Sequence, residues 1–386
     1  MRRRITYGME EMFVGSTGGF NEARNTGQYI SRLDFVQSYD FSFNVQRQAN
    51  KQLGSDFYAI RASQLAPDVN LNVSYLLNDG WNERYIGLDV STGSYTNPVQ
   101  SVFTNSNTGD RNFYVLIAQD EDKDAVAATS VEGYNVLGIG NAFITSYDIS
   151  LSVNGIATVT CSFVGNNASI TNYSNTGVWL PSVGETGQTA ESANKKFGIN
   201  FLDNSRSSRF LTGFQKVFDS GCHYGATTIS SSINQVSGLS FGFDFNNFQN
   251  LQINIPIERK ALYGFGSNYA ATRVVQKPLV ATMSLESIVS GFNSENLAAT
   301  FAAEDVTISG YNFDILFKNM AGKKKLGIKI QNARLDSYSM GTQIGNKTSI
   351  KTNWSFEIND STGILMSGSC GTPTQSAIYI NESINP

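Results

Sequence analysis

Two segments of this 386-residue chain resemble each other closely enough to constrain any fold the chain can adopt. A shift of 212 residues places 36–64 on 248–276 without a gap, with eight identities among 29 positions where chance gives about two. One structural unit is therefore predicted to occur twice. The identical pairs are Gln37/Gln249, Arg47/Arg259, Ala49/Ala261, Gly54/Gly266, Ser55/Ser267, Ala59/Ala271, Arg61/Arg273 and Gln64/Gln276.

A second match follows the first in the same order. The segment 141–147 aligns with 332–338, and a two-residue insertion then brings Phe163 onto Phe356. Ordered matches of this kind predict a tandem duplication. The stretch 174–208 is rich in Gly, Ser, Thr and Asn and contains the predicted boundary. We therefore expect two domains, residues 1–190 and residues 191–386.

The repeated unit has the periodicity of strands. Apolar and polar residues alternate over Tyr39–Val45 and again over Val69–Tyr75, and the alternation from Tyr147 to Phe163 is interrupted by Asn154-Gly155. An Asn-Gly pair is typical of a tight hairpin turn. The sequence predicts an all-β protein with minor helix. A helix is placed at 283–292 or 297–303, although the first segment is equally compatible with a strand followed by a loop.

Composition excludes several classes of chemistry. A chain with one histidine, His223, has no paired-histidine zinc site, and any Ser-His-Asp triad would have to use that residue. The odd set Cys161, Cys222 and Cys370 is widely spaced, so we expect reduced thiols. A net charge of −4 argues against tight binding of nucleic acid. No run approaches the ~18 apolar residues of a membrane span, so membrane insertion is not expected.

The repeat preserves a connection of about twenty residues between two strands, which is long for a compact β domain. In the first half it is the segment Arg47–Ala66. Aromatic residues at its centre and arginines beside them are typical of protein interfaces, although the same aromatics could fold back onto their own sheet. The candidate contact residues are Arg47, Gly54, Ser55, Phe57, Tyr58, Arg61, Arg259, Gly266, Ser267, Tyr269 and Arg273.

Other motifs predict no catalytic or cofactor site. Asp120, Asp122 and Asp124 have the spacing of a calcium loop, but Ala125 stands where such a loop needs glycine, so a solvated hairpin tip is favoured. The acidic pairs that a glycosidase would need are not repeated in the two halves. We therefore expect no enzyme activity, no metal and no cofactor.

These strands, the Arg47–Ala66 connection and the Tyr147–Phe163 hairpin make each half resemble the tail tube proteins of long-tailed bacteriophages. The resemblance implies a β-sandwich or half-barrel domain, six of which close into one barrel around a lumen that carries DNA. A chain with two such domains would form a trimeric ring of pseudo-sixfold symmetry, stacked into a tube through the long connections. It also implies a place in the virion, assembly in the host cytoplasm, and tape measure, tail terminator and baseplate or tail-tip proteins as partners.

A conduit for a polyanion should repel it weakly, so mild acidity suits this interpretation. Candidate lumen-lining residues are Asp40, Ser42, Asn44, Asn70 and Asn254, which alternate with the apolar positions. An ordinary solvated sheet face has the same pattern. The alternative functions are a carbohydrate-binding or glycan-cleaving β-sandwich of a viral or bacterial surface, or another virion component of the neck, baseplate or capsid.

Overall fold

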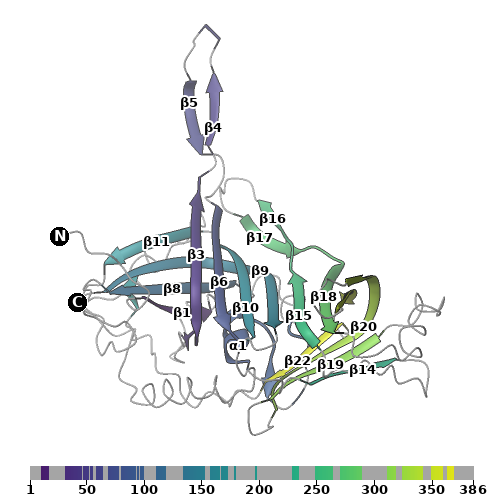
Figure 1. The fold of residues 1–386 in the computed structure, drawn as a ribbon. Coiled ribbons are helices and arrows are strands. Elements are labelled where there is room, and N and C mark those ends of the chain that lie inside the picture. The colour runs from purple at the N-terminus through teal and green to yellow at the C-terminus, as the bar shows by residue number, and fades with distance from the viewer. Residues whose placement is uncertain are drawn as a thin grey trace.

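The protein is built almost entirely of strands (Figure 1). The structure, a computed structural model, describes residues 10–16, 31–45, 47–51, 53–54, 58–63, 68–77, 80–92, 94, 96–99, 110–118, 134–152, 157–165, 167–172, 178–179, 196–197, 228–233, 248–263, 270–288, 311–318, 324–341, 349–359 and 363–368. Within these ranges the one helix is α1 (Trp81–Ile86). The predicted all-β class is confirmed.

The strands of the first half are β1 (Glu10–Ser16), β2 (Ser31–Arg32), β3 (Val36–Asn44), β4 (Arg47–Lys51), β5 (Tyr58–Ser63), β6 (Asp68–Leu76), β7 (Ser91–Thr92), β8 (Asp110–Ala118), β9 (Tyr134–Ser152), β10 (Thr158–Gly165), β11 (Asn167–Asn172) and β12 (Val178–Trp179). Those that follow are β13 (Lys196–Phe197), β14 (Thr228–Ile233), β15 (Phe248–Pro256), β16 (Arg259–Tyr263), β17 (Ala270–Val275), β18 (Leu279–Ile288), β19 (Tyr311–Lys318), β20 (Lys324–Gly341), β21 (Ser349–Ile358) and β22 (Ile364–Gly368).

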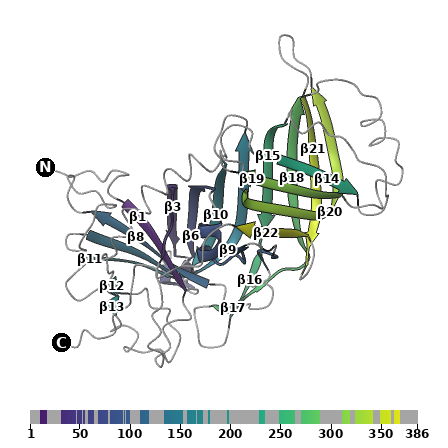
Figure 2. The same cartoon turned by 90° about the horizontal axis from the view of Figure 1, so that it is seen from below.

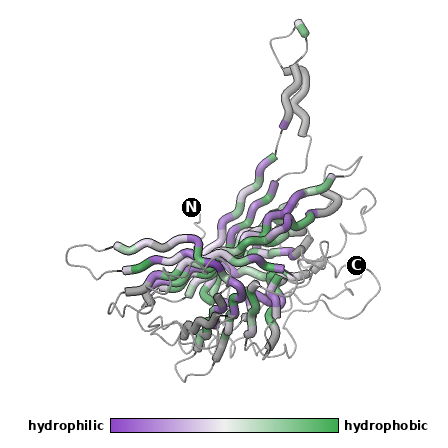
Figure 3. Tube along the Cα trace, turned by 90° about the vertical axis from the view of Figure 1, so that its right-hand side faces the viewer, coloured by the Kyte–Doolittle hydropathy of each residue, from purple (hydrophilic) through white to green (hydrophobic). Residues whose placement is uncertain are grey.

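One antiparallel sheet crosses both halves of the chain. Its order is β20-β21-β18-β15-β9-β10-β6-β3, and Figure 2 shows the strands from β3 to β21 side by side. Apolar and polar residues alternate along these strands (Figure 3), so one face is buried and the other is polar. In one chain this sheet is open and does not close into a barrel.

A second layer covers the apolar face of the sheet. The long strands β9 and β20 each belong to both layers: the first part of β9 pairs with β8 and β11, and the first part of β20 pairs with β19 and β22. Each long strand carries a bulge where it joins the main sheet, at Thr145 in β9 and at Asp336 in β20. A bulge bends a strand, which lets one strand serve two layers.

The two halves have the same pairing pattern. The strands β3, β4 and β5 become β15, β16 and β17 at a constant shift of 212 residues, and the bulges of β9 and β20 correspond at a shift of 191. The expected two-residue insertion is wrong. Phe163 lies opposite Leu71, and Trp354 lies opposite Met283, so Trp354 and not Phe356 holds the position of Phe163.

Of the two alternatives for 283–292, a helix or a strand followed by a loop, the strand is correct where the structure describes the segment. Residues up to Ile288 belong to β18, with Met283 and Leu285 buried and Glu286 on the polar face. Alternation with period two overrides a composition that a helix would tolerate. The other proposed helix, at 297–303, and the boundary at residue 190 lie outside the described residues.

Candidate assembly surfaces

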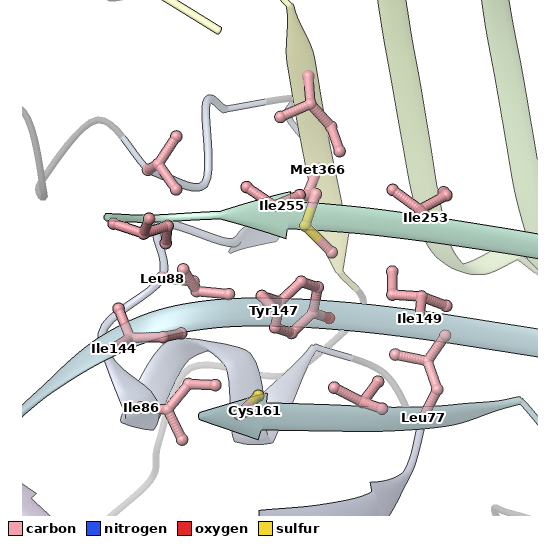
Figure 4. Close-up of a cluster of buried hydrophobic side chains, with 14 of the residues drawn as sticks. Leu77, Ile86, Leu88, Ile144, Tyr147, Ile149, Cys161, Ile253, Ile255 and Met366 are labelled. Carbon is pink, nitrogen blue, oxygen red and sulfur yellow. The ribbon is translucent and has the colours of Figure 1, made fainter. Parts of the chain in front are cut away.

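The two halves are joined by direct pairing of β9 with β15, which we call the in-chain seam. The register runs from Asn250 opposite Ser152 to Pro256 opposite Ser146, with Ile253 opposite Ile149 and therefore central. On the apolar side Ile149 and Ile253 are fully buried, and so are Tyr147 and Ile255 (Figure 4). The seam is therefore an internal strand pair with a complete core beneath it.

A second link joins the halves in the covering layer. Strand β7 pairs in parallel with β22, and beside it Thr96 and Met366 exchange backbone hydrogen bonds of 2.9 and 2.7 Å. The side-chain amide of Asn97 donates to the carbonyl oxygen of Asn359 at 2.6 Å. Met366 is fully buried as a result, and it lies in the cluster of Tyr147 and Ile255 shown in Figure 4. The halves thus share one core.

The main sheet ends in two edge strands. At one end β3 pairs with β6, and at the other the C-terminal part of β20, residues 334–341, pairs with β21; among the described residues neither has a second neighbour. Both edges expose large apolar side chains. Phe43 on β3 is 47% exposed and Met340 on β20 is 56% exposed. Exposed edges with apolar residues favour pairing with another chain.

The predicted lumen residues lie together on the polar face of the main sheet. Asp40, Ser42, Asn44 and Asn70 are exposed and Asn254 is half-buried. The amide of Asn70 on β6 donates to the hydroxyl of Ser42 on β3 at 3.4 Å, and the amide of Asn254 on β15 donates to the carboxylate of Asp148 on β9. The structure places these side chains on the polar face of the sheet; that this face lines a lumen stays a prediction.

Charges on the polar face are mostly acidic. The exposed or half-buried acids are Asp40, Asp68, Asp148, Glu286, Asp336 and Glu357, and two bases lie among them, Arg334 on β20 and Lys351 on β21. Glu286 accepts a hydrogen bond of 2.8 Å from the amide of Asn250. Most other positions carry Ser, Thr, Asn or Gln. The face therefore has little to attract a polyanion.

The long connections predicted as contact loops are β-hairpins. Strands β4 and β5 form the first arm, which projects far from the body in Figure 1, and β16 and β17 form the second arm, which lies close to it. Near the tip of the first arm Leu53 is fully exposed, and Gly54 has a φ of 83°, which favours glycine. Gly54 thus lies in the turn of the first arm.

The predicted contact residues divide by arm. In the first arm Arg47 is exposed at the start of β4, while Tyr58 and Arg61 belong to β5. In the second arm Arg259 and Arg273 are half-buried on β16 and β17. The remaining candidates lie outside the described residues: Ser55, Phe57, Gly266, Ser267 and Tyr269.

The arginines of the second arm bind the first half of the chain. The guanidinium of Arg259 lies 5.0 Å from the centroid of the Phe143 ring and that of Arg273 lies 5.9 Å from it, within range of cation–π attraction. Arg259 Nε also donates to the carbonyl oxygen of Ile144 at 3.2 Å. Burial lowers the pKa of Arg273. The second arm is therefore held against β9 by paired side chains.

A buried polar cluster anchors α1 under the first half of the sheet. The hydroxyls of Tyr75 and Tyr147 donate to Glu83 Oε1 at 2.9 and 3.1 Å, and the Cys161 thiol lies 3.8 Å from the Tyr75 hydroxyl. All four side chains are fully buried, so the cluster has no access for a substrate. Sequence reasoning missed α1, although glycines with positive φ bracket it, Gly80 and Gly87.

Several candidates from the sequence lie outside the described residues. These are His223, Cys222, Cys370 and the acidic run around Asp122. In the described ranges no three His, Cys, Asp or Glu side chains group as metal ligands would. Across those same ranges, no helix has both the length and the apolar character needed to span a membrane.

Comparison with known proteins gives structural neighbours of low similarity. No family model matches the chain, and no curated protein matches its sequence. A chain from the sixfold-symmetrised baseplate of the anti-feeding prophage matches with 12% identity and a TM-score of 0.28, over 37% of this chain and 93% of that chain. A chain of the SPP1 tail tube matches with 12% identity and a TM-score of 0.26, over 50% of this chain and 98% of that chain. TM-scores at this level assign neither a family nor a function.

Proposed function

We propose that this protein is the structural subunit of a bacteriophage tail tube, in which three chains form a ring and rings stack into a conduit for DNA. One observation carries the proposal: a single antiparallel sheet runs through both halves, with a continuous polar face and an edge strand at each end. A sheet of this kind is completed only when its edges are paired. In this account the two halves are two copies of one domain.

The dimensions of such a ring suit passage of a duplex. Three copies of the eight-stranded main sheet give 24 strands, which at a spacing of about 4.8 Å form a ring about 37 Å across, and strand tilt widens it. The polar face, with Asp40, Asp148, Glu286 and Glu357, would line the lumen. Because cationic contacts would hold the phosphate backbone, a mostly acidic lining lets DNA slide.

The remaining features have roles in the same assembly. The covering layer and α1 would form the outer wall, and the first arm would reach the adjacent ring. We assign the chain a virion location after assembly in the host cytoplasm, no catalytic role, and tape measure, terminator and baseplate or tail-tip proteins as partners.

Electron microscopy of the purified full chain tests this function. The expected result is rings or tubes with a central pore, and native mass spectrometry of single rings should give three chains of 42.1 kDa each. A chain that stays monomeric at high concentration, or particles without a pore, would refute the tube function. Tubes that retain double-stranded DNA at physiological salt would contradict the proposed lining.

A further inference from the structure

We infer that copies of this chain join head to tail, with β3 of one copy paired to the C-terminal part of β20 of the next in the register that β15 and β9 use within the chain. The inference rests on the proposed function only for the number of copies in the ring. Three alternatives compete with it: pairing of β3 with β3, pairing of β20 with β20, and association through another surface. The in-chain seam decides among them.

The two edge strands are the counterparts of the two strands at the in-chain seam. Strand β3 corresponds to β15 at a shift of 212 residues, and β20 corresponds to β9 at a shift of 191. The chain therefore already contains one junction between a β9-type strand and a β15-type strand. A second copy placed as the second half is placed on the first would pair its β3, the remaining β15-type strand, with β20 of the first copy, the remaining β9-type strand.

Exposure of individual side chains supports this pairing. Phe43 is 47% exposed, whereas its counterpart Ile255 at the in-chain seam is 1% exposed. Met340 is 56% exposed, whereas its counterpart Ile149 is 0% exposed. Both exposed side chains are on the apolar side of the sheet. They are thus core residues of an incomplete seam.

The covering layer gives an independent observation. Ile170 lies opposite Leu137 on β9, and Met366 lies opposite Ile328 on β20, so Ile170 and Met366 are counterparts. Ile170 is 69% exposed, while Met366 is fully buried beside Thr96 at the second link between the halves. A neighbouring copy in the same relation would cover Ile170 too. Residues of both layers therefore point to the same neighbour.

The in-chain register fixes the partners across the new junction. Gln252 lies opposite Ser150, which places Asp40 opposite Gly341; Ile253 opposite Ile149 places Phe41 opposite Met340. Because β3 and β20 are different strands, the contact is heterologous, and it generates a ring when the rotation closes. The cation–π contact of the second arm is not repeated at the new junction. Arg334 holds the position of Phe143, so the arginines of the first arm have no aromatic side chain at that position.

Cysteine cross-linking tests the strand pair and its register. The double variant Asp40→Cys, Gly341→Cys is made with Cys222→Ser and Cys370→Ser, while the buried Cys161 is kept. Asp40 is exposed, and a Cβ added at Gly341 meets no atom within 4 Å, so the fold should tolerate both changes. Mild oxidation should give disulfide-linked dimers and trimers and no longer species. The matched in-chain control is Gln252→Cys, Ser150→Cys, which should cross-link within one chain.

Three outcomes overturn the inference. One is an efficient in-chain control with no cross-link between chains. Another is equal yield from the shifted pair Asp40→Cys, Ser339→Cys, whose diagonal separation of about 7–8 Å exceeds disulfide reach. The third is dimer formation by Asp40→Cys alone, which indicates β3 with β3. Mixing the single variants Asp40→Cys and Gly341→Cys should give dimers only, each containing one chain of each kind.

A charge substitution gives a second, non-covalent test. Met340→Lys places an ammonium on the apolar side of the junction, and the exposed position leaves the fold intact, so assembly should be lost with an unchanged circular dichroism spectrum. Ser339→Lys, the control on the polar face, should still assemble. Full assembly of Met340→Lys would refute the junction. Tubes that form without the cross-link would support the tube function and refute the junction. Cross-linked trimers that do not stack into tubes would support the junction and refute the tube function.

Discussion

At the scale of single residues, the chain combines a buried polar cluster with apolar side chains left at its edges. Glu83 accepts hydrogen bonds from Tyr75 and Tyr147 in a fully buried site, while Phe43 and Met340 remain exposed at positions whose counterparts are core. The cluster stabilises one chain. The exposed apolar residues are the ones to which the proposed junction gives a partner.

Removing the buried carboxylate should destabilise the first half strongly. Glu83→Ala leaves two buried hydroxyls without their acceptor, so we expect a loss of about 2–4 kcal/mol in the free energy of unfolding. Glu83→Gln keeps an acceptor oxygen and should lose less. Urea denaturation at low protein concentration measures the change, with Arg84→Ala, an exposed neighbour, as the control. Equal stability of Glu83→Ala and Arg84→Ala would contradict the role of the cluster.

The same tyrosines predict a decline in stability at alkaline pH. Burial, as the largest cause, raises the pKa of Tyr75 and of Tyr147 above its value of about 10 in the unfolded chain. Their contribution is complete below pH 10 and is lost as the pH rises further, by about 1.4 kcal/mol per pH unit for each group. Tyr75→Phe should flatten the decline measured between pH 9 and 11, and Tyr85→Phe should not. A decline equally steep in Tyr75→Phe would exclude this cause.

At the scale of elements, the two arms have the same hairpin but different environments. The second arm is held on Phe143 by Arg259 and Arg273, whereas the first arm projects from the body with Leu53 exposed at its tip. Counterpart elements thus differ because one has its neighbour within the chain. In the proposed tube, the first arm is the element that would reach a neighbouring ring.

Deletion of the first arm should separate ring formation from stacking. Replacing 50–62 by a short turn removes the projecting hairpin and leaves β3 and β6 paired, so we expect single rings in electron micrographs and an unchanged spectrum of secondary structure. Shortening the second arm at 263–270 is the matched control, and it should leave tubes intact. Tubes of normal length from the first deletion would exclude a stacking role for that arm.

The sequence predicts elements better than it predicts their neighbours. The strands β3 and β6 were found because alternation is local, and the repeat was found because Arg47 and Gly54 are identical in both copies. The in-chain seam could not be found, since Phe41 and Ile253 have the same pattern while one lies at an edge and the other is interior. The arms lack alternation, so their hairpins were predicted as loops.

At the scale of the whole molecule, the proposed ring makes one chain a segment of a larger closed sheet. Among the described residues, β3 and the C-terminal part of β20 each pair with one strand of the main sheet only. Because these two strands are the counterparts of β15 and β9, which pair within the chain, each edge can pair with the other edge of a neighbouring copy. An open sheet with apolar edges is liable to uncontrolled pairing, and closure into a ring removes that liability. The open sheet is therefore the feature of the fold that motivates the proposed self-assembly.

The most direct test of this account is the structure of the assembled particle by cryo-electron microscopy. We predict a ring of three chains with 24 continuous strands, in which Asp40 of one copy lies opposite Gly341 of the next and the polar face lines the pore. A ring in which β3 and the C-terminal part of β20 lie apart, or in which the polar face points outward, would contradict it.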